Sequence, residues 1–109
     1  VVVVGGGLAG LAASIEASRR GAKVTLMEKG KKIGGNSSKA TSGINGALTA
    51  AQKETGAPDT LKNFADDVIK SGGGKSSPEL VDLLVQKSTE AVEWLEDFGL
   101  DLSLISQCG

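Results

Sequence analysis

The sequence has no histidine, one cysteine, and no aromatic residues beyond one tryptophan and two phenylalanines among its 109 residues. A single cysteine excludes an internal disulfide, and the lack of histidine argues further against a zinc site. Twelve basic residues nearly balance thirteen acidic ones, so charge favours neither nucleic acid nor a membrane surface as a partner. No apolar run approaches the roughly 20 residues of a membrane span. The few aromatic residues predict a thin core, as in part of a larger protein.

Glycine, in contrast, is abundant, with 16 residues, and the most informative glycines lie near the start of the chain. Four valines at residues 1–4 lead directly into Gly5-Gly6-Gly7-Leu8-Ala9-Gly10, which reads Gly-x-Gly-x-x-Gly. The valine run is typical of a parallel strand buried on both faces. The three motif glycines permit a tight turn, close approach of the backbone to a pyrophosphate, and close packing of helix on strand. The run therefore predicts a helix whose N-terminus binds a dinucleotide.

The residues that follow complete a βαβ unit over residues 1–28. Helix formers predict a helix over 8–20, and Gly21 suits the left-handed position that ends it. Residues 23–28 predict a second strand, and Glu28 lies about 20 residues beyond the motif, where an acid binds a ribose hydroxyl. We expect an α/β fold, with a Rossmann-like unit of a doubly wound parallel sheet in which this chain supplies one partner for the first strand. The chain begins within a strand and ends without a terminating signal, so we expect an incomplete domain.

A polar, glycine-rich segment over residues 29–47 follows this unit. Loops of this length in compact domains are usually functional or disordered. Its glycines and small hydroxyl residues favour a surface that brings backbone N–H groups close to a flat ligand. Its lysines form either a solvated face or a source of positive potential around an anion.

The remainder, residues 48–109, is predicted to be mainly helical. Asp59 is expected to cap a helix whose apolar stripe runs from Leu61 to Ile69. The run 71–76 contains Gly-Lys-Ser, but it lacks the earlier glycine and the upstream strand of a phosphate-binding loop. We therefore expect a connector between helices.

A second helix is predicted to begin at Ser77 and Pro78, with Ser76 as an alternative cap, and to end at Gly99. Its apolar face is expected to consist of Leu80, Leu84, Ala91, Val92, Leu95 and Phe98.

The segment 29–47 makes the functional prediction more specific. Its runs Ile33-Gly34-Gly35-Asn36-Ser37 and Ser42-Gly43-Ile44-Asn45-Gly46-Ala47 resemble the flavin-contacting segment of the fumarate reductase and succinate dehydrogenase flavoprotein superfamily. Within that superfamily the chain is most similar to the soluble fumarate reductases of fungi and protists and to bacterial flavocytochromes. The resemblance continues through Trp94 and Gly99 and covers essentially the whole chain.

This resemblance implies that FAD lies along the first βαβ unit. Relatives with covalent FAD carry a histidine where this chain has Asn36, so the resemblance implies non-covalent FAD. Carried over by position, the pyrophosphate contacts fall on Gly5, Gly7, Leu8, Ala9 and Gly10, the adenosine ribose contacts on Glu28 and Lys29, and the flavin contacts on Gly35, Asn36, Ser37, Thr41, Ser42 and Gly43.

The resemblance also implies an FAD-dependent oxidoreductase that reduces fumarate to succinate by hydride transfer from reduced FAD. NADH and reduced flavin are the candidate electron donors, and cytoplasm and mitochondrion the candidate compartments. The arginines and histidines that act on substrate in the family have no counterpart here, so we expect no catalytic residue within the chain and no activity from it alone. A related ketosteroid dehydrogenase or urocanate reductase, a truncated non-catalytic fragment, and an NAD-binding domain are the alternatives.

Overall fold

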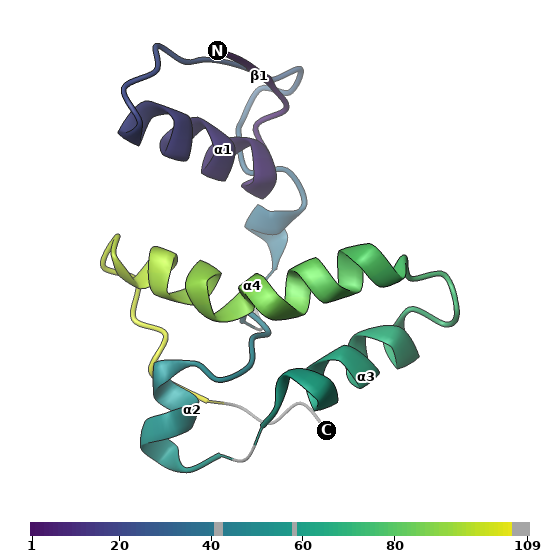
Figure 1. Ribbon diagram of the computed structural model, residues 1–109. Helices are drawn as coiled ribbons and strands as arrows, with labels where there is room; N and C mark the ends of the chain where they lie inside the picture. The colour runs from purple at the N-terminus through teal and green to yellow at the C-terminus, as the bar shows by residue number, and fades with distance from the viewer. Residues whose placement is uncertain (41–42, 58, 106–109) are drawn as a thin grey trace. The chain divides into compact units, whose positions relative to one another are not determined.

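The computed structural model describes residues 1–40, 43–57 and 59–105, and it divides the chain into two compact units, Val1–Gly43 and Ile44–Gly109 (Figure 1). The boundary falls inside the glycine-rich segment 29–47. Within the described residues, every helix is too short or too polar to cross a membrane.

The first unit is the βαβ unit predicted from the sequence, which the structure confirms. Strand β1 (Val2–Val4) pairs in parallel with β2 (Thr25–Met27), with Val3 opposite Leu26. Helix α1 (Leu8–Arg19) connects the two strands. The helix ends where expected, because Gly21 has a φ of 84°, which a residue with a side chain rarely adopts.

Val2 and Val4 of β1 are exposed and Val3 is half-buried, so the expectation of a strand buried on both faces is wrong for this chain. Val2 and Val4 are 63% and 82% exposed. Burial on both faces requires helices on each side of a sheet, and this unit has α1 as its one α-helix among the described residues. Strand β1 likewise has β2 as its one strand partner there.

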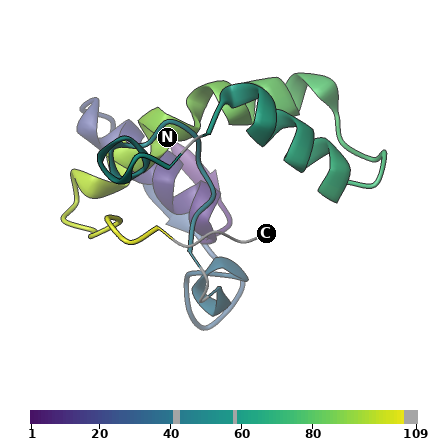
Figure 2. The same ribbon diagram turned by 90° about the horizontal axis from the view of Figure 1, so that it is seen from below.

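The second unit is helical, as predicted. A short helix, α2 (Ala50–Thr55), precedes α3 (Leu61–Ser71) and α4 (Pro78–Glu96). Helices α3 and α4 lie side by side (Figures 1 and 2). The glycines that join them have positive φ, 56° at Gly73 and 78° at Gly74. A helix and not a strand precedes this run, which confirms the connector and excludes the phosphate-binding loop.

The helix starts follow local capping chemistry, with one correction to the sequence prediction. Thr60, not Asp59, caps α3, because its side chain accepts a hydrogen bond from the Asn63 N–H. Asp59 instead accepts the Thr60 N–H at 2.7 Å. Helix α4 begins as predicted, with Ser77 as N-cap and Pro78 in the first turn.

The buried face of α4 differs from the predicted one. Leu80 and Leu84 are 66% and 50% exposed, so the expected stripe is wrong over the first half of the helix, and Ala91 and Phe98 are exposed as well. Of the expected stripe, Val92 alone is fully buried. The buried residues of α4 are Val81, Val85, Ser88 and Val92. These residues follow helical spacing, and one of them is a serine. Because a hydrophobic pattern does not count serine as a core residue, it does not predict this face.

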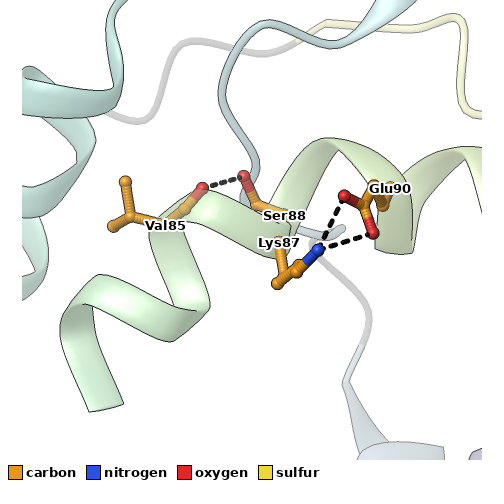
Figure 3. A network of polar contacts seen from close by, with 4 residues as sticks. All are labelled: Val85, Lys87, Ser88 and Glu90. Atoms are coloured by element: carbon orange, nitrogen blue, oxygen red, sulfur yellow. Dashed lines mark hydrogen bonds and ion pairs between the residues drawn. The ribbon is translucent and has the colours of Figure 1, made fainter. Parts of the chain in front are cut away.

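The buried serine of α4 holds a residue of the preceding loop. Ala47 is fully buried, and its N–H donates to Ser88 Oγ at 3.3 Å. Ser88 Oγ in turn donates to the Val85 carbonyl at 3.1 Å (Figure 3). The neighbouring Thr89 Oγ1 donates to the Ala47 carbonyl at 2.7 Å. Both backbone polar groups of Ala47 are therefore satisfied by α4, which anchors residues 44–47 on that helix.

Replacing Ser88 with alanine leaves the Ala47 N–H buried without its acceptor. We expect Ser88→Ala to lower the free energy of unfolding by about 1–2 kcal/mol, which is the cost of a buried unsatisfied donor reduced by the better helix propensity of alanine. Urea denaturation measures the change. Gln86→Ala, at an exposed position of the same helix, is the matched control and should change stability by less than about 0.5 kcal/mol. Equal stability of the two variants would contradict the anchoring role of Ser88.

Candidate functional site

The turn between β1 and α1, residues 5–10, is called the glycine turn below. Gly5 has a φ of 105°, and its N–H donates to the Met27 carbonyl at 2.7 Å, which ties the turn to β2. A Cβ on Gly10 would lie 1.8 Å from the Gly5 carbonyl oxygen. Because no side chain fits in that space, α1 and β1 can approach this closely only with glycine at position 10.

The N-terminus of α1 is open toward a ligand. Gly7 is the N-cap residue, and no side chain caps the first turn. The first hydrogen bond of the helix runs from the Leu11 N–H to the Gly7 carbonyl at 2.9 Å, so the N–H groups of Leu8, Ala9 and Gly10 precede the helical ladder. A Cβ on Gly7 would meet nothing within 4 Å. Uncapped N–H groups beside open space at a helix N-terminus fit a phosphate.

Gly6 is a structurally constrained position that the motif does not predict, because it occupies a variable place in Gly-x-Gly-x-x-Gly. Its N–H donates to Glu28 Oε2 at 2.7 Å, and its carbonyl accepts the Gly34 N–H at 2.7 Å. A Cβ on Gly6 would lie 3.0 Å from Ile33 Cγ2 and 3.1 Å from Glu28 Oε2. The run of three consecutive glycines is the sequence feature that could have indicated this position.

The carboxylate of Glu28 lies at the end of β2 beside the glycine turn, as predicted. Oε1 accepts the Gly30 N–H at 2.7 Å, and Oε2 accepts the Gly6 N–H. These two backbone donors, Gly30 first and Gly6 second, lower the pKa of Glu28 below its ordinary value, with a smaller contribution from Lys29. The side chain is thus an oriented anion, and Lys29 is exposed next to it.

The start of the predicted flavin-contacting segment lies against the glycine turn. Gly34 forms an isolated parallel bridge with Gly7, and a Cβ on Gly35 would lie 3.4 Å from Gly7 Cα. A 3₁₀ turn over Ser37–Lys39 follows, with Asn36 as its N-cap. The structure therefore brings Gly35 directly to the turn and places Asn36 and Ser37 immediately after it.

The other predicted flavin contacts are not brought to the turn by any described contact. Gly43 is exposed, with a φ of 126° that favours glycine. Thr41 and Ser42 lie outside the described residues. Lys39 Nζ donates to Asn36 Oδ1 at 3.4 Å, which is a local contact of the 3₁₀ turn.

The donor set of this site fits a dinucleotide. Backbone N–H groups at a helix N-terminus suit a pyrophosphate, and a carboxylate at the end of the second strand suits ribose hydroxyls. Among the described residues, no group of three or more histidine, cysteine, aspartate or glutamate side chains is arranged to hold a metal ion.

Comparisons with known proteins agree with this geometry. A family model described as an FAD binding domain matches residues 1–107. Fumarate reductase 1 of Saccharomyces cerevisiae is 49% identical over 111 residues, which cover all of this chain and 24% of the relative. NADH:fumarate oxidoreductase of Klebsiella pneumoniae is 43% identical over 109 residues, which cover all of this chain and 12% of the relative.

Among solved structures, a flavocytochrome c3 fumarate reductase in an open conformation is similar with a TM-score of 0.92 and 36% identity. The likeness covers 99% of this chain and 19% of that chain. The chain thus spans at most 24% of the length of each of these three proteins.

Gly7 and Gly10 of the glycine turn differ in the space around them, so alanine substitutions at these two positions should have different effects on stability. We expect Gly10→Ala to lower the free energy of unfolding by about 3 kcal/mol or more, because its methyl group would overlap the Gly5 carbonyl oxygen. Gly7→Ala should leave stability unchanged or raise it by up to about 1 kcal/mol, because its φ of −77° suits alanine and its methyl group meets open space. Thermal and urea unfolding measure both. Similar stability of the two variants would contradict the close approach at Gly10.

The Glu28 carboxylate makes the stability of the first unit depend on pH. Because its pKa is lowered in the folded chain, the ionised form stabilises the fold above the ordinary glutamate pKa of about 4.3. This stabilisation is lost as pH falls through the lower, folded-state pKa. The difference in unfolding free energy between wild type and Glu28→Gln should therefore be largest near neutral pH and shrink below about pH 4. Urea denaturation over a pH series measures the difference, and a constant difference would contradict the prediction.

Proposed function

The chain belongs to the FAD binding domain family, and on that premise we propose that it forms the FAD site of an oxidoreductase that reduces fumarate to succinate. The observation that carries the proposal is the bridge between Gly34 and Gly7. It joins the segment expected to contact the flavin to the turn expected to hold the pyrophosphate. This contact supports a single site for both parts of the cofactor within the first unit.

The roles of individual residues follow from their positions in the first unit. The N–H groups of Leu8, Ala9 and Gly10 bind the pyrophosphate, while Glu28 accepts hydrogen bonds from the ribose hydroxyls. Gly35 adopts a φ of 55° that strains a residue with a side chain, and without a side chain its backbone can lie close to the cofactor. When bound and reduced, FAD supplies the hydride for the alkene. The protein contributes binding and orientation in this part of the chain.

The cofactor is proposed to be held without a covalent bond, because Asn36 stands where relatives with covalent FAD carry a histidine. The family resemblance assigns no catalytic residue to this chain. Among the arginines, Arg20 Nε pairs with Glu16 at 2.7 Å on the surface of α1, which supports a structural role for it. Similarity to two fumarate-reducing relatives favours a small dicarboxylate as substrate. NADH or reduced flavin is the proposed electron donor.

The proposal predicts that the protein containing this chain purifies with FAD and oxidises reduced flavin when fumarate is added. Denaturation should release all of the FAD into the supernatant, because attachment is non-covalent. Absorbance of the released flavin and succinate formation are the two measurements. Fumarate turnover no higher than that of urocanate or a ketosteroid would contradict the choice of substrate, and protein without bound flavin would contradict the cofactor site.

Gly7→Ala tests the site directly, because it should block FAD binding without unfolding the protein. Its methyl group points into the open space at the helix N-terminus, where the pyrophosphate is proposed to lie. The variant should fold, lose FAD, and lose fumarate reduction in the same proportion. Full activity without bound FAD would contradict the link between this site and the reaction.

A further inference from the structure

The glycine turn is held in place at Gly6, which is not one of the three motif glycines. The residues that hold it, Glu28 and Gly34, lie outside the motif. Gly6 is buried, its N–H donates to Glu28 Oε2, and its carbonyl accepts the Gly34 N–H, both at 2.7 Å. Both backbone groups of one residue are therefore fixed by the stretch between Glu28 and Gly34. The peptide that follows Gly6 carries the Gly7 N–H, and the helix N-terminus begins at the next residue. The direction of the ligand-facing N–H groups thus depends on how Gly6 is held.

We propose that Glu28 is a positioning residue for the pyrophosphate as well as a ribose contact, because its hydrogen bond to Gly6 sets the phosphate-binding conformation of the glycine turn before FAD arrives. This inference rests on the FAD site proposed above and deepens it. In this proposal the carboxylate of Glu28 affects binding of the pyrophosphate without contacting the pyrophosphate itself.

The two roles are compatible because of the acceptor capacity of a carboxylate. An ionised glutamate offers about four acceptor positions, and the N–H groups of Gly6 and Gly30 occupy one on each oxygen. The remaining positions serve the ribose hydroxyls. Both N–H bonds are made within the chain itself, so FAD is proposed to meet a turn that is already ordered, which lowers the entropic cost of binding.

A chemical double-mutant cycle separates the two roles. Wild-type and Glu28→Gln holoproteins are stripped of FAD and titrated with FAD and with its 2′,3′-dideoxyadenosine analogue, which lacks the ribose hydroxyls. Quenching of flavin fluorescence gives the dissociation constants. A glutamine offers a single acceptor oxygen in place of two. We expect the substitution to weaken binding of the analogue about tenfold, because the loss acts through the turn and not through the hydroxyls.

A loss of less than about threefold for the analogue overturns the proposal, since Glu28 would then act through the ribose alone. Wild-type protein that binds neither ligand would contradict the proposed FAD site itself, so the two failures are distinguishable. Gly21→Ala is the matched control for stability. It strains the first unit at a φ of 84° and lies away from the turn, so it should lower the melting temperature and keep both affinities.

A second measurement needs no variant and holds even if Glu28→Gln folds poorly. In the wild-type protein stripped of FAD, the Gly6 N–H should exchange with solvent slowly, because Glu28 accepts it. Hydrogen exchange followed by mass spectrometry or NMR measures the rate. Exchange of Gly6 at the rate of an unstructured peptide overturns the proposal by itself.

Discussion

The first unit depends on the close approach of the glycine turn to its neighbours, with Gly10 packed on Gly5 and Gly6 packed on Ile33. Gly10 lies where a Cβ would overlap the Gly5 carbonyl oxygen, and Gly6 lies where a Cβ would press on Ile33. A side chain at either position would push α1 away from β1, or push residues 28–34 away from the turn. The open helix N-terminus exists only because these contacts are made without side chains.

The parts predicted well from sequence are those determined by local chemistry. Gly21 ends α1 because few other residues adopt its positive φ, and Pro78 starts α4 because its missing N–H is harmless in the first turn. The strand that ends just before Glu28 is also predicted from local sequence, whereas the contact of Glu28 with the turn depends on the pairing of β1 with β2. For the end of α1 and the start of α4, the neighbouring residues are enough to explain the structure.

The parts that were missed depend on partners far away in the sequence. Gly6 is held by residues 22 and 28 positions later, which no local pattern reveals. The face of α4 was misplaced because Ser88 is buried by its hydrogen bond to Ala47, 41 residues earlier. A hydrophobic pattern gives a serine no reason to be buried, so it predicts a buried face that contains Leu80 and Leu84 and not Ser88. The valines of β1 are a third example, because burial of a strand on both faces depends on helices that pack on each side of its sheet.

The same physical device anchors both ends of the segment that resembles a flavin-contacting loop. Within the first unit, Gly34 is bound through its N–H to Gly6, and within the second, Ala47 is bound through its N–H and carbonyl to Ser88 and Thr89. Each anchor uses backbone groups of the segment, so each fixes the chain at one residue within its own unit. A cradle of backbone N–H groups and one carboxylate recognises phosphate and ribose, which are common to every FAD molecule. Such a cradle fits a dinucleotide and carries no selectivity for an alkene, so the proposed preference for fumarate would have to arise from side chains that contact the substrate.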